Sequence, residues 1–441
     1  MANLEISSVL VHAGVEDAPE PFEAEPERPF RILLAGDFSG RAWRSDCRPV
    51  VLRPIDRDNF DDVLHDQGLE VDVEGVRLQF HELEDFHPDR IWARVGKFEE
   101  MHRTGAADTP APATPPPAGG NILDQILAEE EGTPPAMAAD ANDLAGFIRR
   151  ASAGHVVPRQ SAEARESESA RTAAAGRFLR SILHHPRFQA TEAAWRAALM
   201  VVRGLDTTGG TIEIHVLDAT LPELIAQMEG IHKELARKGP WGCIAGNYVF
   251  GQTQTDVEVL SRLGALARSL RAPFLAEGRL PEDVENAVWE EFRRSDAARW
   301  IGLALPRFLL RLPYGKDMLS IDSFPFEEMT ENEHGAYLWG NPAFFCALLI
   351  GQSFLLHGWN LGRRLIRRID GLPQAIYLED GEPCAKPCAE IWMTEREAES
   401  ILEAGFMPLA SIKNEPAALI VRFQSVARPA RGLEFGTGEG D

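Results

Sequence analysis

The sequence predicts an α/β fold in which a mixed, mostly parallel sheet is flanked by helices. The main observation is that short apolar runs alternate with amphipathic stretches of helical length after residue 173. Strands and helices that alternate at these lengths form largely parallel sheets covered on both faces. A second observation is a compact pattern of strand, hairpin and helix between Arg28 and Arg103. We therefore expect a small α/β domain followed by a larger one.

The small domain is predicted over residues 28–103. Its first element is the run FRILLAG, which is typical of a buried strand. The run GLEVDVEGVRLQFHEL then predicts a hairpin that turns at Glu74 and Gly75. A helix is expected over HPDRIWARVGKFEEM, because Pro88 suits a first helical position. Its apolar stripe consists of Ile91, Trp92, Val95 and Phe98.

Connecting segments are predicted in the middle of the chain. Residues 104–120 are almost all Pro, Ala, Gly and Thr, a composition that is typical of a linker. Residues 121–131, NILDQILAEEE, predict a short amphipathic helix, and a low-complexity connector follows over residues 132–172. At the two ends we expect a flexible N-terminal arm, residues 1–27, and a flexible acidic tail, residues 429–441.

The larger domain is predicted over residues 173–428. Helices are expected over AGRFLRSILHH and FQATEAAWRAALMVVRGL. The alternating part consists of TIEIHVLDA (strand), LPELIAQMEGIHKELARKG (helix), GCIAGNYVF (strand), QTDVEVLSRLGALARSLRA (helix), PFLAEG (strand) and WIGLALP (strand). The run NPAFFCALLIGQSFLLHG predicts a long apolar helix that ends at Gly358. Residues 374–423 predict shorter strands and one further helix.

Composition excludes several classes of function. A net charge of −23 disfavours binding to nucleic acid or to an anionic membrane, since both need clustered Lys and Arg. No apolar run reaches the roughly 20 residues of a membrane span, and the N-terminus lacks the basic start of a secretory signal. The five scattered cysteines argue against a disulfide framework. We expect a cytoplasmic protein.

The motifs predict no catalytic residue, no cofactor and no metal site. The chain lacks a P-loop and a G-x-G-x-x-G run, and Cys384 and Cys388 lack a second pair at zinc spacing. An acidic cluster at residues 322–334 offers groups for acid–base or metal chemistry, and a solvated loop in an acidic protein explains it as well. Its members are Asp322, Glu327, Glu328, Glu331, Glu333 and His334. An enzyme that uses this cluster is one alternative function.

Eight stretches resemble the contractile sheath of the bacterial type VI secretion system. Before the linker, FRILLAGDFSGR, RPIDRDNFDDVL and LEDFHPDRI are similar to the small sheath subunit. After the linker, ILHHPRFQATEAAWR, WGCIAGNYVFGQTQTDVEVL, APFLAEG, IGLALPRFLLRLPYG and YLWGNPAFFCALLIGQSF are similar to the large subunit, in the same order. The chain resembles a fusion of the two subunits, and the match to the large subunit ends near Val426.

The resemblance implies a contractile-sheath-like fold and a structural rather than a chemical function. Sheath subunits self-assemble into rings or a helical polymer around an inner-tube protein, above baseplate components, and contract to drive the tube outward. The large subunit of the family normally continues into a further C-terminal portion. An alternative is therefore a sheath-derived accessory protein that caps, seeds or anchors the sheath or baseplate without polymerising.

The resemblance also implies two partner-binding segments. In the family, the large subunit begins with a short amphipathic helix that an AAA+ unfoldase recognises when it dismantles contracted sheaths. The corresponding apolar face is formed by Ile122, Leu123, Ile126 and Leu127, and docking of this helix on its own domain is the alternative. Sheath subunits also exchange β-strands. The candidate donor strand carries Leu4, Ile6, Val9 and Val11, and a frayed N-terminus is the alternative.

Overall fold

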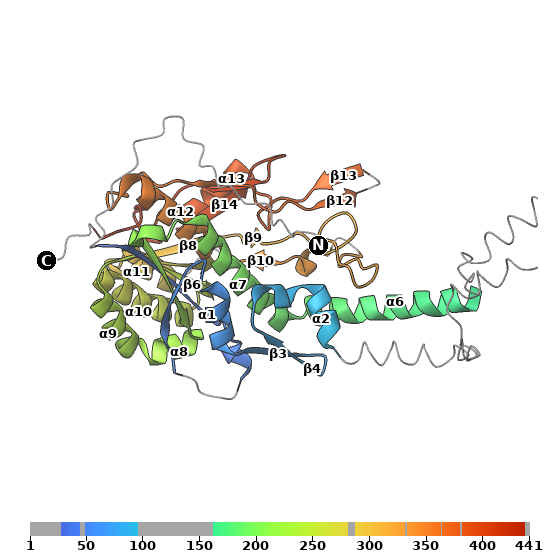
Figure 1. The fold of residues 1–441 in the computed structure, drawn as a ribbon. Helices are drawn as coiled ribbons and strands as arrows, with labels where there is room; N and C mark the ends of the chain where they lie inside the picture. The colour runs from blue at the N-terminus through green and yellow to red at the C-terminus, as the bar shows by residue number, and fades with distance from the viewer. Residues whose placement is uncertain are drawn as a thin grey trace, which may run out of the picture. The chain divides into compact units, whose positions relative to one another are not determined.

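The computed structural model describes residues 28–44, 49–95, 162–280, 287–330, 333–362, 364–379 and 382–436 (Figure 1). The chain divides into two compact units. One consists of residues 1–94 and 178–441, and the other of residues 95–177. Helix α6, Ala162–Leu183, therefore begins in the second unit and ends in the first. The predicted connecting segments 104–120 and 121–131 lie outside the described residues.

A nine-stranded sheet organises the first unit. Its order is β11-β15-β14-β8-β7-β6-β1-β5-β2. The central strands, all parallel, are β1 (Phe30–Gly36), β5 (Ile212–Asp218), β6 (Trp241–Phe250), β7 (Phe274–Gly278) and β8 (Ile301–Leu305). The outer strands are β2 (Leu52–Ile55) at one edge and β14 (Met407–Ser411), β15 (Ala417–Ile420) and β11 (Arg368–Asp370) at the other. Antiparallel pairs occur only among these outer neighbours in the described sheet, so the predicted mixed, mostly parallel sheet is confirmed.

The two predicted α/β regions share this single sheet. Strand β1, from the smaller predicted region, pairs with β5 on one side and with β6 on the other, and both come from the larger predicted region. Strand β2 adds to the same sheet through β5. The physical reason is the run FRILLAG, which is buried at every position except the half-buried Arg31. A strand that is apolar on both faces needs a neighbour on each side and a helix layer on each face.

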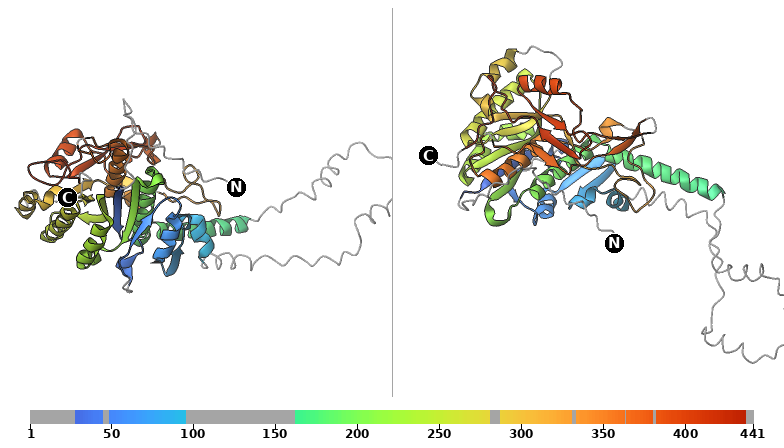
Figure 2. Two further views of the ribbon diagram at one scale, coloured as in Figure 1. Left: turned by 60° about the vertical axis from the view of Figure 1, so that its left-hand side comes forward. Right: turned by 90° about the horizontal axis from the view of Figure 1, so that it is seen from above.

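Helices cover both faces of the sheet (Figure 2). On one face, α12 (Pro342–His357) packs across β6, β7, β1 and β8 and against α7 (Pro186–Gly204). On the other face lie α8 (Leu221–Ala226), α9 (Met228–Lys238), α10 (Gln254–Leu270) and α11 (Ala287–Arg293). Within the described ranges, none of the helices has the length and apolar content that a bilayer crossing requires.

Helix α12 is buried almost all round and packs closely against its neighbours. As predicted, it ends before Gly358, whose φ of 59° suits glycine. The Asn341 side chain accepts a hydrogen bond from the backbone N–H of Ala343 and caps its start. A Cβ at Gly351 would lie 2.7 Å from Leu205. Glycine at this position therefore allows the helix to approach the core closely.

The remaining elements surround this core. The predicted hairpin is formed by β3 (Leu69–Val73) and β4 (Val76–Phe80), which turn at Glu74 and Gly75. The predicted helix at Pro88 is α2 (Pro88–Arg94). The other elements are α1 (Phe60–Gln67), α13 (Glu395–Glu403) and the pairs β9 (Phe308–Leu309) with β10 (Trp339–Gly340) and β12 (Ile376–Glu379) with β13 (Glu382–Ala385).

Candidate functional site

The predicted acidic cluster at residues 322–334 does not form a shared site in the structure. Glu328 is 1% exposed, whereas the side chain of Glu327 is exposed and accepts a hydrogen bond from the backbone N–H of Lys316 at 3.1 Å. His334 points to a different partner, the carboxylate of Glu390, at 3.2 Å. Glu331 lies outside the described residues. Among the described residues, no three His, Cys, Asp or Glu side chains are grouped so that they could hold a metal ion.

Buried Glu328 belongs instead to an ion-pair network around Arg311. The guanidinium of Arg311 donates to both Glu328 oxygens at 2.8 and 2.9 Å, and to Glu192 of α7 at 2.8 Å. Arg196 donates to the same Glu192 carboxylate at 2.7 Å. The Glu328 carboxylate also accepts the backbone N–H of Tyr314 at 2.7 Å. The network therefore ties the loop after β9 to helix α7.

The electrostatics of this network favour charged groups. Burial on its own raises the pKa of Glu328, but the charge of Arg311 and the hydrogen bonds that the carboxylate accepts outweigh it and lower the pKa to about 2. Burial opposes the charge of Arg311, but the carboxylates of Glu192 and Glu328 outweigh it and raise the pKa of Arg311 well above its ordinary value. An arginine between two buried glutamates is a fixed structural group, because a proton donor or acceptor in catalysis must change its charge near the working pH.

The same loop also contacts the small-subunit-like region. The Asp89 carboxylate of α2 accepts hydrogen bonds from the backbone N–H groups of Asp322 and Ser323, both at 3.0 Å. The ring of Trp92, also on α2, lies 4.4 Å from that of Phe324. The acidic stretch is thus a joint: Glu328 connects it through Arg311 to Glu192 of α7, and its backbone N–H groups bind Asp89 of α2.

A second joint lies at the carboxyl ends of β1 and β5. The Asp218 carboxylate accepts hydrogen bonds from the backbone N–H groups of Phe38 at 2.8 Å and Ser39 at 3.1 Å, and from the Ser39 hydroxyl at 2.7 Å. Arg41 pairs with Asp218 at 3.3 Å and with Glu223 at 2.8 Å. Its hydrogen bonds lower the pKa of Glu223 to about 2.

This position is the one at which open α/β sheets usually bind ligands. The strand order reverses here, because β5 and β6 flank β1 on opposite sides, and the crevice beyond such a reversal is the common binding position. In this chain the Asp218 carboxylate already accepts the backbone N–H groups that would hold an anionic ligand. The joint therefore fastens residues 37–41 to β5 and α8.

Glu277, near the end of β7, is a third candidate for a functional residue, because its pKa is raised above the ordinary value. Burial raises the pKa of this carboxyl to about 7; the positive charge of Arg307 opposes the shift and Glu390 adds to it. A pKa raised in the folded state means that this group supports folding fully below pH 4.5, its ordinary range, and that the support is lost as pH rises through about 7.

We therefore expect Glu277→Gln to raise the free energy of unfolding by roughly 2–3 kcal/mol at pH 8 and by less than about 1 kcal/mol at pH 5. Urea denaturation at the two pH values measures this difference. The control is Glu213→Gln, which changes a more exposed carboxylate that pairs with Arg31. An equal effect of Glu277→Gln at both pH values would contradict the prediction.

The donor-strand residues Leu4, Ile6, Val9 and Val11 and the helix residues Ile122, Leu123, Ile126 and Leu127 all lie outside the described residues. The hairpin β12–β13 pairs with no other strand in the described part of the chain. Its Ile376 is 61% exposed.

Sequence reasoning missed the residues that make the joints. Arg311 and Asp218 were not singled out, although each carries a usable signal. Arg311 is a single charge inside the apolar run FLLRLPY, and Asp218 ends the apolar strand IEIHVLD. A lone charge in a buried run must find an opposite charge, because an unpaired buried charge is costly. The signal shows that a partner exists but does not identify it.

Two family comparisons and one relative match the chain. The family described as VipB, EvpB/VC_A0108, tail sheath N-terminal domain, matches residues 173–280 and 278–427. The family described as type VI secretion system, VipA, VC_A0107 or Hcp2 matches residues 16–107. The type VI secretion system sheath protein TssC1 of Pseudomonas aeruginosa is 32% identical over 291 residues. That alignment covers 56% of this chain and 58% of the relative, so the chain spans less than two thirds of the relative's length.

Proposed function

Because this chain belongs to the tail-sheath family of type VI secretion systems, we propose that it is a structural subunit that assembles as a contractile sheath around an inner tube. One chain carries both a small-sheath and a large-sheath segment. We place it in the cytoplasm, with an inner-tube protein, baseplate components and an AAA+ unfoldase as its partners. The accessory role, in which the protein caps, seeds or anchors the sheath, is the alternative.

The observation that supports this proposal most strongly is the position of β1. It comes from the segment that matches the small-sheath family, yet it lies between β5 and β6 of the segment that matches the large-sheath family. Two subunits that share a sheet in this way must fold together. A covalent connection keeps them at equal numbers, and the backbone hydrogen bonds of the shared sheet let a force on one segment reach the other.

The enzyme alternative is not favoured. The family consists of structural sheath proteins, and the carboxylates of Glu327 and Glu328 accept hydrogen bonds from other groups of the same chain. A catalytic pair would need two carboxyl groups that face a common space with pKa values set apart by their surroundings. Glu328 is enclosed by Arg311 and Tyr314 and does not face such a space.

Electron microscopy of the full chain, with and without its inner-tube protein, tests the sheath proposal. We expect cylinders or stacked rings, because subunits that donate a strand to an open edge such as β12–β13 join in series. A variant with Ile6→Asp and Val9→Asp should remain folded and lose the cylinders. The matched control is Ser7→Asp with Ser8→Asp. Stable monomers or single rings from the unaltered chain would favour the accessory role instead.

A separate experiment tests recognition of the proposed unfoldase helix. Ile126→Asp with Leu127→Asp should leave folding intact and abolish binding to the unfoldase, because charge on the apolar face prevents a helix from entering a groove. The control, Gln125→Asp with Ala128→Asp, adds the same charge to positions outside the four apolar ones. Binding of labelled full chain to the unfoldase, measured by fluorescence anisotropy, is the readout. Equal binding by the two variants would refute this role for the helix.

A further inference from the structure

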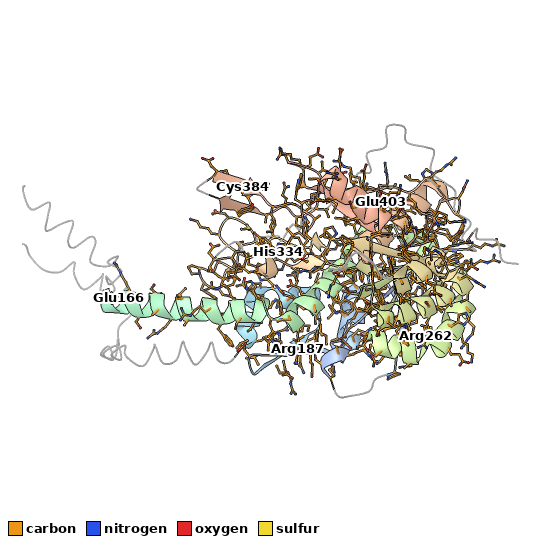
Figure 3. The ribbon with its side chains drawn as sticks, turned by 180° about the vertical axis from the view of Figure 1, so that it is seen from behind. Glu166, Arg187, Arg262, His334, Cys384 and Glu403 are labelled. Carbon is orange, nitrogen blue, oxygen red and sulfur yellow. The ribbon has the colours of Figure 1, made fainter. Side chains whose placement is uncertain are left out.

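A large open groove lies beyond the carboxyl ends of three neighbouring strands. Gln252 follows β6, Leu280 follows β7, Leu305 ends β8 and Pro306 follows it, and all four line the groove. Helices α11 and α13 form its sides; Figure 3 labels Glu403, the last residue of α13. Its volume is about 1700 Å³. This exceeds the roughly 300–1,000 Å³ of small-molecule pockets, so the groove suits a length of polypeptide. We call it the arginine groove, for the reason that follows.

The groove combines exposed apolar side chains with a buried aromatic floor. Ile391 is 57% exposed, Trp392 is 50% exposed and Leu280 is 41% exposed, and all three line the groove. Trp289 of α11 is buried and stacks on Phe406 at 5.6 Å. Large apolar side chains that gather in one exposed place mark interaction surfaces, whereas scattered ones need no explanation.

The charge of the groove is opposite to that of the whole chain. Five arginines and three glutamates line it, in a protein whose net charge is −23. Glu290 already pairs with two of these arginines, Arg293 and Arg428. The other three arginines are exposed and form no ion pair with any described residue: Arg294, Arg396 and Arg422. An acidic polypeptide with an aromatic or apolar side chain would complement this surface.

We propose that the arginine groove binds the acidic, proline-rich segment of residues 16–27 from a second copy of this chain. The segment, EDAPEPFEAEPE, contains six carboxylates and no basic residue. Its three prolines favour an extended polyproline conformation, which docks in grooves lined by aromatic side chains. Phe22 lies at its centre and would contact Trp392. The carboxylates on either side would pair with the three exposed arginines.

The sheet explains why the segment comes from another copy. Residue 28 precedes the start of β1, and β1 runs parallel to β6, β7 and β8 in nearly level register. The arginine groove lies beyond the opposite ends of these strands. With seven residues, β1 spans about 23 Å, so the segment leaves the sheet at the end farthest from the groove.

Complementary surfaces at opposite ends of one subunit produce head-to-tail contacts, and such contacts continue into an open polymer unless they close into a ring. The inference rests on the proposed function only in that a sheath supplies repeated copies. The inference adds a specific contact between the arginine groove and the acidic segment, whose prolines favour an extended conformation. This contact differs from the strand exchange proposed for residues 3–11. Because the contact is exposed and charged, we expect salt to weaken it.

The test uses two charge-reversed variants of the full chain. The groove variant carries Arg294→Glu, Arg396→Glu and Arg422→Glu, and the arm variant carries Glu20→Lys, Glu23→Lys and Glu25→Lys. Sedimentation velocity over a range of concentrations measures association. Each variant alone should associate at least about tenfold more weakly than the unaltered chain, because like charges then face each other. The control, Arg203→Glu at an exposed position of α7, should associate normally.

Mixing the two variants gives the decisive result. The lysines of the arm variant face the glutamates of the groove variant, so a one-to-one mixture should recover association. A mixture that stays dissociated, an unaltered chain that remains monomeric, or a groove variant that associates normally would each overturn the inference. The same variants distinguish this contact from the proposed function. Cylinders formed by the groove variant would contradict only the proposed groove contact. An unaltered chain that associates through the groove without forming cylinders would contradict only the proposal of a sheath.

Discussion

Arg311→Met should lower the free energy of unfolding by about 3–5 kcal/mol. The side chain is 5% exposed and lies between Glu192 and Glu328, which are 0% and 1% exposed. Methionine has a similar length and packs well, so the loss comes from charge rather than from volume. Without the guanidinium, Glu328 loses its principal positive partner, and a buried carboxylate without one is costly. Urea denaturation followed by circular dichroism measures the change.

The pH dependence of this loss separates charge from packing. In the unaltered chain the pKa of Glu328 is about 2, so its contribution is complete above pH 4.5 and disappears as pH falls toward 2. In the variant, burial raises the pKa of the same carboxyl, and protonation then relieves the unpaired charge. The difference between the two proteins should therefore shrink as pH falls from 7 to 5. A difference that stays constant with pH would show that packing causes it.

A triple variant provides the matched control. Arg311→Met combined with Glu192→Gln and Glu328→Gln removes the buried charges together and keeps the side-chain volumes. We expect it to recover at least about half of the lost stability, because neutral amides can still accept the backbone N–H of Tyr314 and hydrogen bonds from Arg196. A triple variant no more stable than Arg311→Met would mean that the hydrogen-bond geometry, and not the charge balance, holds this joint.

The fold class could be predicted because its evidence is local. Strands such as FLAEG and helices such as α10 follow from apolar runs and 3.6-residue periodicity within single segments. Strand order is not local. The run FRILLAG indicates that β1 is buried on both faces, yet nothing within it specifies β5 and β6 as neighbours. The prediction of a small region followed by a larger one therefore could not include the pairing that joins both in one sheet.

The joints and the arginine groove escaped prediction for the same reason. Arg311 and Glu192 are 119 positions apart in the sequence, and Asp218 binds Ser39 across 179 positions. Each ion pair depends on a topology that single-sequence patterns do not contain. The arginine groove draws its side chains from the ends of three strands, two helices and the segment around Arg428. Its composition becomes visible only after these elements are placed together.

A single aspartate in β1 should separate the two sheath segments. Leu34 is fully buried and faces Val216 of β5 and Ala245 of β6 in the strand register. Leu34→Asp would bury an unpaired carboxylate at the centre of the sheet, with an expected loss of at least about 4 kcal/mol. The control, Val51→Asp, places the same charge on an exposed side chain just before β2 and should change stability by less than about 0.5 kcal/mol.

A protease site inserted between residues 104 and 120 converts this stability effect into a measurement of association. After cleavage of the otherwise unaltered chain, the two fragments should elute together from a sizing column, because β1 and β2 remain paired in the sheet without the peptide connection. The cleaved Leu34→Asp chain should release the small-subunit-like fragment, and the cleaved Val51→Asp chain should not. Fragments of the unaltered chain that separate on cleavage would show that the linker, rather than the shared sheet, holds the two sheath segments together. The fusion would then be a requirement of the fold, whereas stable fragments would make it a means of keeping two mutually dependent segments at equal numbers and high effective concentration.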